Sequence, residues 1–336
     1  MHRISTLVVF AVLFSACTSS QEPKATVSFY YWKTIFKLTD AEKEVLKDNQ
    51  VDRLYIRYFD IALDEGKAIP MSPVVFDEHP QSSAIVPVVY IRNAVMLQPA
   101  LDVADLATKT VDYINQINEK LAIPCQEIQI DCDWTLTSRE TYFSYIEAVK
   151  KRWGKKLSAT IRLHQVKYYQ KAGIPPVDRG VLMYYNMGRI TADSSNSIYD
   201  RETAHRYIRS LRGYPLALDV ALPVFSWGIH VRNNTVIGLL NKVDDTTFGH
   251  DAHFNKKASP FFEVRENVIK IGHYFQRGDR IKIESIQPDD LQQMADDLSE
   301  EMTQQPHEII FYDLDYFNLK NYEKEKQFFQ KISHAF

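Results

Sequence analysis

Two carboxylates stand two residues apart in the segment 127–135, which reads EIQIDCDWT. If this segment is a strand, Gln129, Asp131 and Asp133 share one face, because successive strand side chains alternate between faces. Two acids on one face repel, and a shared site spreads their pKa values apart for acid–base work. The pattern therefore favours chemistry on a sugar or at a metal. The alternative is structural, with one Asp capping the next helix and the other pairing with an arginine.

Three arginines occupy matching places near predicted strand ends: Arg57, Arg92 and Arg162. Strand alternation predicts that all three point into the same space as the acids, with His164 on the same face as Arg162. Guanidinium groups keep their charge, so they need anionic partners. Two interpretations stay open. The arginines neutralise the two aspartates and a third acid, or their surplus charge binds a carboxylate or sulfate on a sugar.

Short β-rich runs alternate with helical periodicity along most of the chain, which predicts βα units around a parallel sheet. Thr39 with Glu42 and Thr137 with Glu140 fit capping boxes at the start of two helices. Eight βα units predict an α/β fold, a (β/α)8 TIM-type barrel, whose functional residues gather at the C-terminal strand ends. An open doubly wound sheet is the alternative, but no G-x-G-x-x-G follows the first strand. The predicted strands are 26–32, 53–59, 85–92, 127–133, 157–164, 180–186, 216–225 and 308–313.

Residues 244–286 depart from this alternation, because they carry three strand-like runs of their own between predicted strands seven and eight. We interpret this region as a small β-rich insertion beside the barrel mouth. His250 and His253 lie within it at H-x-x-H spacing, without carboxylate or cysteine partners at helical spacing. No metal site and no cofactor are therefore predicted.

Several strand ends, taken in order, resemble glycosyl hydrolase family 18, the chitinases and endo-N-acetylglucosaminidases. The fourth strand of that family ends in D-x-D-x-E, commonly DIDWE, where this chain has DCDWT at 131–135. The sixth ends in M-x-Y-D or Y-N, and residues 183–186 read MYYN. The segment ALPVFSWG at 221–228 resembles the seventh strand. YDLD at 312–315 stands where the family has W-x-x-D at the end of the eighth.

The resemblance implies a substrate-assisted mechanism, in which the family Glu protonates the leaving oxygen and an Asp and a Tyr hold the N-acetyl group of the substrate. Carried over, Asp133 and Tyr185 keep these positioning roles, with Asp131 beside them in the catalytic set. Thr135 replaces the Glu and has no titratable proton in range. The remaining motif residues are expected to contact substrate: Trp134, Asn186, Tyr312, Asp313 and Asp315.

The missing Glu leaves three possibilities open. Another carboxylate at the barrel mouth serves as the acid, the candidates being Asp60, Asp219, Asp313 and Asp315. Alternatively, the site binds a glycan without cleaving it. In the third possibility the chain represents a distinct glycoside-hydrolase-like family in which Asp133 is itself the acid.

Composition limits the partners of the chain. Its 336 residues are 45% hydrophobic, enough for one large core. A formal net charge of −3 gives no overall basic field, so nucleic acid is not expected as a partner. The 12% aromatic content suits a carbohydrate-stacking surface and an ordinary core equally well.

The first 16 residues are typical of an export signal, with a charged start at 2–3, an apolar run at 4–14 and small residues before Cys17. The run is too short to span a bilayer, which takes about 20 residues. The order resembles a bacterial lipoprotein signal, in which the Cys becomes the lipidated N-terminus, although Phe14 stands where Leu is commonest. A plain secretory signal with a chance Cys is the alternative. Residues 17–25 are then a polar tether, and 26–336 form the barrel with its insertion.

Together these patterns predict an exported lipoprotein, anchored in a membrane of the cell envelope through Cys17. Its glycoside-hydrolase-like barrel is expected to act on a carbohydrate, either an N-acetylated or an acidic glycan. The alternative is a catalytically inactive lipoprotein that binds glycans or takes part in cell-envelope assembly.

Overall fold

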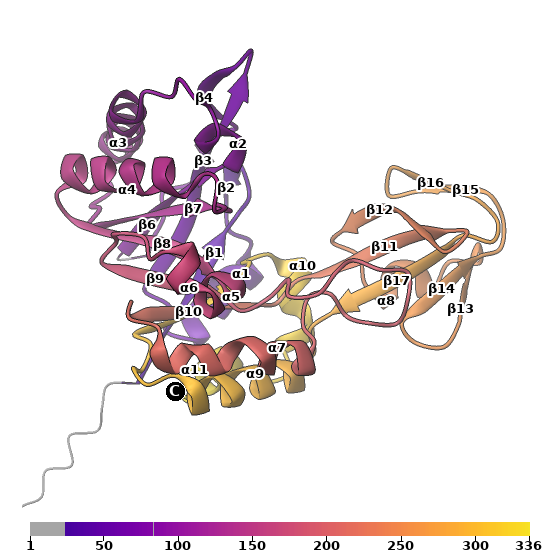
Figure 1. Ribbon diagram of the computed structural model, residues 1–336. Helices are drawn as coiled ribbons and strands as arrows, with labels where there is room; N and C mark the ends of the chain where they lie inside the picture. The colour runs from indigo at the N-terminus through magenta and orange to yellow at the C-terminus, as the bar shows by residue number, and fades with distance from the viewer. Residues whose placement is uncertain (1–23, 83) are drawn as a thin grey trace, which may run out of the picture.

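The computed structural model describes residues 24–82 and 84–336, whose arrangement is shown in Figure 1. The predicted signal peptide, Cys17 and most of the tether lie outside the described residues.

Eight parallel strands close into a barrel, as the sequence predicts. Pairing runs β1-β18-β10-β9-β8-β7-β6-β3, and β3 pairs back onto β1 with Leu54 opposite Phe29, which closes the sheet. Strand β3 is longer than predicted, because it turns at Gly66 into β4 (Lys67–Met71), which pairs with it antiparallel. The barrel strands are β1 (Thr26–Tyr31), β3 (Arg53–Asp64), β6 (Ala84–Ile91), β7 (Glu127–Cys132), β8 (Lys156–Arg162), β9 (Arg179–Met183), β10 (Leu218–Pro223) and β18 (Glu308–Tyr312).

Helices cover the outside of the barrel (Figure 1). The capping box of Thr39 and Glu42 starts the first of them, as predicted. The second predicted capping box is wrong, because that helix follows Ser138, and the hydroxyl of Thr137 instead contacts that of Thr135 at 2.9 Å. The helices of the barrel are α1 (Asp40–Asp48), α2 (Asn93–Met96), α3 (Val103–Leu121), α4 (Arg139–Trp153), α5 (Leu163–Lys167), α6 (Tyr169–Ala172), α7 (Arg201–Ile208), α9 (Pro288–Glu301), α10 (Tyr316–Leu319) and α11 (Phe328–Ser333), with 3-10 turns η1 (Arg209–Gly213) and η2 (Lys320–Tyr322).

The apolar stripes of the two long helices pack against the sheet. Val111 and Ile114 of α3 and Tyr145 and Ile146 of α4 are buried, each on the face that i, i+3 and i+4 spacing selects. These residues join the apolar strand side chains in one core cluster. The helices therefore hold the strand ends in fixed places, which is what a site at the barrel mouth requires.

A second, antiparallel sheet projects from the barrel, at the right of Figure 1. It begins at Ser226, earlier than the predicted insertion at 244–286. The predicted strand 216–225 is shorter in the structure, where β10 ends at Pro223, and the last residues of the ALPVFSWG segment, from Ser226 on, pair with β17 instead. The insertion contains β11 (Ser226–Arg232), β12 (Thr235–Asn241), α8 (Asp245–Gly249), β13 (Phe254–Lys256), β14 (Phe261–Val264), β15 (Val268–Lys270), β16 (His273–Phe275) and β17 (Arg280–Ser285).

The insertion has its own apolar core, which includes Leu240, Phe248, Phe262 and Ile281.

The remaining strands, β2 (Ile35–Phe36) and β5 (Val75–Phe76), form a short parallel pair near β3. None of the helices in the described part of the chain combines the length and the apolar character needed to cross a bilayer.

Candidate functional site

Asp131 and Asp133 lie at the C-terminal end of β7, as predicted. The carboxylate of Asp131 is inside the barrel, where it accepts a hydrogen bond from Thr160 Oγ1 of β8 at 2.7 Å. Asp133 comes just after the strand, is about 40% exposed, and forms an ion pair with Arg162 at the end of β8. Burial and the charge of Asp133 together raise the pKa of Asp131 to about 6, against the lowering effect of the Thr160 hydrogen bond. The two carboxylates therefore have different environments, one buried and one ion-paired.

Tyr185 reaches the same space from the end of β9. Its ring stacks on that of Tyr312 at 5.6 Å between centroids and meets the edge of Phe225. Burial raises the pKa of the Tyr185 phenol well above its ordinary value, and the charges of Asp131 and Arg162 act on it as well. Tyr185 therefore lies close enough to Asp131 to be affected by its charge, and the Tyr185 hydroxyl stays neutral and able to donate a hydrogen bond.

Two of the three predicted arginines are neutralised by acids. Arg57 is buried and pairs with Asp60 at 2.7 Å, and Arg162 pairs with Asp133. Arg92 is exposed before α2, and no ion pair joins it to another described residue. For Arg57 and Arg162 the structure thus agrees with the ion-pair interpretation, because β3 places Asp60 where it neutralises Arg57.

A small pocket of about 90 Å³ opens between β8 and β9. Arg162, His164, Tyr185 and Asn186 contribute to its lining, so these predicted substrate residues do lie together. Within the described part of the chain, the buried Nε of Arg162 has no hydrogen-bond partner. Burial and the charge of Arg162 lower the pKa of His164, which keeps the imidazole neutral at pH 7. The pocket therefore presents uncharged donors and acceptors beside one guanidinium edge.

Trp134 does not face the mouth. It is 2% exposed and stacks on Tyr142 of α4 at 5.9 Å, because the strand has ended and its alternation no longer applies. A contact between this indole and substrate, which the sequence predicted, is not compatible with that position. Thr135 does face outward, and its hydroxyl contacts those of Thr137 and Ser138.

The aspartates after β18 have different surroundings. Asp315 caps α10 through the backbone N–H of Phe317 and pairs with Lys242 at 2.7 Å, so its predicted substrate role gives way to a structural one. Asp313 accepts a hydrogen bond from Asn318 at 2.6 Å. Burial and the charge of Asp315 raise the pKa of Asp313 to about 6.

Asp219 lies at the opposite end of the barrel and is not a candidate acid. It is the second residue of β10, and its carboxylate pairs with Arg179 at 2.6 Å. Asp60 is nearer the mouth, but Arg57 already pairs with it. Of the four alternative carboxylates, Asp313 therefore remains at the mouth with a raised pKa.

Four aromatic side chains form a rim beside the mouth that the sequence did not predict as a group: Trp32, Phe225, Trp227 and Tyr312. Trp32, directly after β1, meets Tyr312 edge-on at 5.5 Å, and Phe225 contacts both Tyr312 and Trp227. These rings are partly buried beside the mouth. Aromatic faces of this kind are suited to stacking on sugar rings. Two features of the sequence could have indicated the rim: Trp32 ends the predicted strand 26–32, and Trp227 belongs to the segment ALPVFSWG that resembles the seventh strand.

The described residues contain no group of three or more His, Cys, Asp or Glu side chains arranged to hold a metal ion. The mouth is therefore a set of paired carboxylates, arginines and aromatic rings.

No protein-family model matches the sequence, and no curated protein matches it either. Solved structures do match the fold. A chitinase from Bacteroides thetaiotaomicron is 10% identical with a TM-score of 0.54, covering 93% of this chain and 96% of its own. The spore cortex-lytic enzyme SleL of Bacillus cereus is 14% identical with a TM-score of 0.53, covering 94% and 75%. A chitinase-like agglutinin from Robinia pseudoacacia is 10% identical with a TM-score of 0.50, covering 92% and 98%. The resemblance that the strand-end motifs indicated is thus confirmed in the fold, which this chain shares with chitinase-like (β/α)8 barrels.

Proposed function

We propose that this chain binds a glycan at the barrel mouth and performs glycoside-hydrolase-type chemistry on it. The observation that carries the proposal is the convergence of Asp131, Asp133 and Tyr185 beside an aromatic rim. Paired carboxylates in different environments are the usual means of holding one proton and one negative charge near neutral pH. Asp131, with its raised pKa, is the proton carrier, and the ion-paired Asp133 is the charged partner.

The charges at the mouth favour an N-acetylated glycan over an acidic one. Arg57 and Arg162 are already neutralised, which leaves few cationic groups for a carboxylate or sulfate on the sugar. The neutral Tyr185 hydroxyl and the small pocket beside Asn186 suit an acetamido group, which offers one donor and one acceptor. A chitinase and a chitinase-like agglutinin among the proteins of similar fold support this choice of substrate class.

We also propose that the protein is exported and anchored by lipid at Cys17, in the cell envelope. The order of charged start, apolar run and small residues before the cysteine supports this. A membrane anchor of this kind would keep the barrel close to surface glycans.

The test uses a matched pair of variants. Asp133 and Asp112 are both about 40% exposed and both pair with an arginine, but Asp112 lies on the outside of the barrel, in α3. With N-acetylglucosamine oligomers as substrate and products followed by mass spectrometry, Asp133→Asn is expected to lower the cleavage rate by about 10²-fold or more. Asp112→Asn should leave the rate within about two-fold. An unchanged rate in Asp133→Asn, with its melting temperature preserved, removes this residue from the mechanism.

Binding without cleavage is the second candidate, and Thr135 favours it. The Thr135 hydroxyl lies where the resemblance expects the acid and cannot supply a proton. If the wild-type chain binds these oligomers but releases no product, while Thr135→Glu releases product, the natural protein is a binder that lacks its acid. Product release by the wild type supports the hydrolytic proposal.

A further inference from the structure

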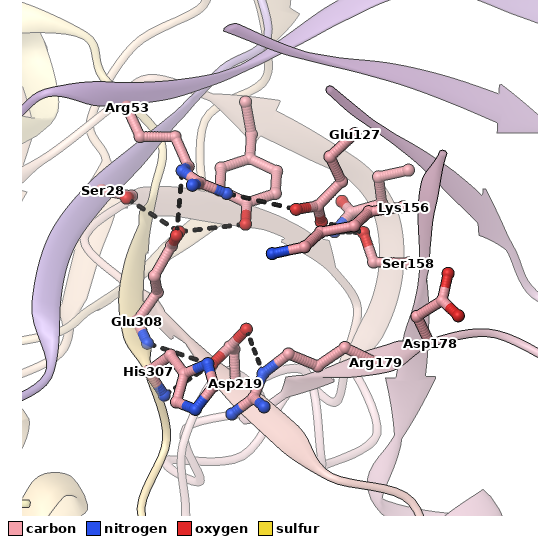
Figure 2. Close-up of polar contacts among 12 residues, drawn as sticks. Ser28, Arg53, Glu127, Lys156, Ser158, Asp178, Arg179, Asp219, His307 and Glu308 are labelled. Atoms are coloured by element: carbon pink, nitrogen blue, oxygen red, sulfur yellow. Dashed lines mark hydrogen bonds and ion pairs between the residues drawn. The ribbon is translucent and has the colours of Figure 1, made fainter. Parts of the chain in front are cut away.

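The N-terminal end of the barrel, opposite the mouth, contains a cavity of about 560 Å³. It is lined by the first residues of several strands, and Figure 2 shows their side chains as a ring. In this fold that end ordinarily serves stability and the chemistry takes place at the other. The cavity is thus separate from the proposed glycan site.

Two of its carboxylates share one arginine. Arg53 pairs with Glu308 at 3.0 Å and with Glu127 at 3.1 Å (Figure 2). Glu308 also accepts hydrogen bonds from Tyr55 and Ser28. Burial raises the pKa of Glu308 to about 7, so near neutral pH this group carries a proton part of the time. The negative charge of this half of the ring is therefore small.

The other two carboxylates are also satisfied. Asp219 pairs with Arg179 and accepts the backbone N–H groups of His307 and Glu308. Asp178 pairs with Lys150 at 2.7 Å, outside the cavity lining. Each acid of the ring thus pairs with a cationic side chain, and Glu127 and Glu308 share theirs.

Three cationic or potentially cationic side chains of the lining remain unused: Lys24, Lys156 and His307. Within 24–82 and 84–336, the side chains of these three residues form no ion pair and no hydrogen bond with another residue. In Figure 2 the ammonium group of Lys156 points toward the centre of the ring, with Arg179 and His307 across from it. The cavity therefore offers unpaired cationic or potentially cationic side chains on more than one side, which suits an anion.

We propose that this cavity binds a phosphate group. A tetrahedral phosphate offers acceptor oxygens in several directions, which suits donors on β8 and in the residues before β1 and β18 better than a flat carboxylate does. The volume exceeds that of one phosphate, so the group can carry a substituent such as glycerol.

The ligand has two possible sources, a free phosphate compound or the headgroup of an anionic phospholipid. The chain enters the barrel at this end, since Lys24 and Thr26 line the cavity. Lys24 comes seven positions after Cys17, which is at most about 25 Å of extended chain. The lipid source thus rests on the proposed anchor at Cys17, whereas the free phosphate source does not. Basic groups this close to a membrane are attracted to anionic lipids.

The experiment measures phosphate binding by the full chain at low salt. Calorimetry with inorganic phosphate and with glycerol phosphate is run on the wild type, Lys156→Gln, Lys156→Arg and the control Lys67→Gln. Lys156 and Lys67 are both exposed, but Lys67 lies in the β3–β4 hairpin. Lys156→Gln should weaken binding about ten-fold, as expected for loss of one charged hydrogen bond, and added salt should weaken it too. Lys156→Arg and Lys67→Gln should bind within about two-fold of the wild type.

Vesicles distinguish the two sources. The same proteins are sedimented with vesicles of phosphatidylcholine alone and of phosphatidylcholine with phosphatidylglycerol, because an N-terminal lipid would hold the chain on both alike. Extra binding to the anionic vesicles that disappears in Lys156→Gln assigns the headgroup as ligand. Calorimetric binding without this difference assigns a free phosphate compound. If no phosphate compound binds and no vesicle preference depends on Lys156, the proposal is overturned, while the glycan proposal is unaffected.

Discussion

At the scale of single residues, Asp131 links stability to function. Its carboxyl group is buried, and its folded-state pKa of about 6 lies above the ordinary 3.8. A raised carboxyl pKa means that the folded state binds the proton more tightly, so stability falls as the pH rises from about 4 through 6. One pKa unit corresponds to about 1.4 kcal/mol, so ionised Asp131 costs the folded state on the order of 3 kcal/mol at pH 8.

Asp131→Asn should therefore raise the free energy of unfolding by about 1–3 kcal/mol at pH 8 and change it little at pH 4. The asparagine oxygen can still accept the hydrogen bond from Thr160, so the gain is not offset by a lost partner. Denaturant unfolding at both pH values, with Asp112→Asn as the surface control, measures the difference. Glycan cleavage should be lost in the same variant. Equal free energies of unfolding for variant and wild type at pH 8 would show that ionised Asp131 does not destabilise the folded state.

At the scale of elements, the buried side chain of Asp279 joins two parts of the insertion to each other. Asp279 is 2% exposed, accepts two hydrogen bonds from Arg232 and one from His230, and thereby joins the turn before β17 to β11. The pKa of Asp279 is held at about 2, because these hydrogen bonds together outweigh the cost of its burial. Since this pKa is lowered, its stabilising contribution is present above pH 4 and is lost as the pH falls through 2.

Asp279→Asn should destabilise the insertion, because it removes the anionic acceptor of the hydrogen bonds from Arg232 and His230, and hydrogen bonds to charged groups contribute about 1.5–3 kcal/mol. The barrel has a separate core cluster and should keep its stability. Hydrogen exchange read by mass spectrometry distinguishes the two regions. Faster exchange in β11 and β17 with unchanged exchange in β7 and β8 is the expected result. Uniform acceleration in both sheets would contradict the independence of the insertion.

At the scale of the whole molecule, the proposed anchor decides where the barrel works. If lipid is attached at Cys17, the mature wild type should partition into the detergent phase and Cys17→Ala should not be processed to the same mature form. Detergent partitioning followed by mass spectrometry of the N-terminal peptide checks both. A wild type found entirely in the aqueous phase, without lipid on Cys17, would rule out the anchor and leave a plain secretory signal.

The sequence by itself determined the features that depend on neighbours along the chain. Strand-forming runs, helical stripes such as Val111 with Ile114, and the capping box of Thr39 are local, and they were enough to predict the eight-stranded barrel. Because parallel strands bring their C-terminal ends to one face, the same patterns also predicted that Asp131 and Tyr185 lie near each other.

Only the tertiary structure decided what depends on distant partners. Ser226–Arg232 lies beyond the predicted strand 216–225 and before the predicted insertion, but it pairs with Arg280–Ser285 in a second sheet, and no local pattern indicates that pairing. Trp134 turns into the core as soon as β7 ends, and Asp60 neutralises Arg57 through a bulge in β3. Side-chain alternation sets directions only within a regular strand, whereas the partner of a buried charge is chosen by the packing of the whole chain.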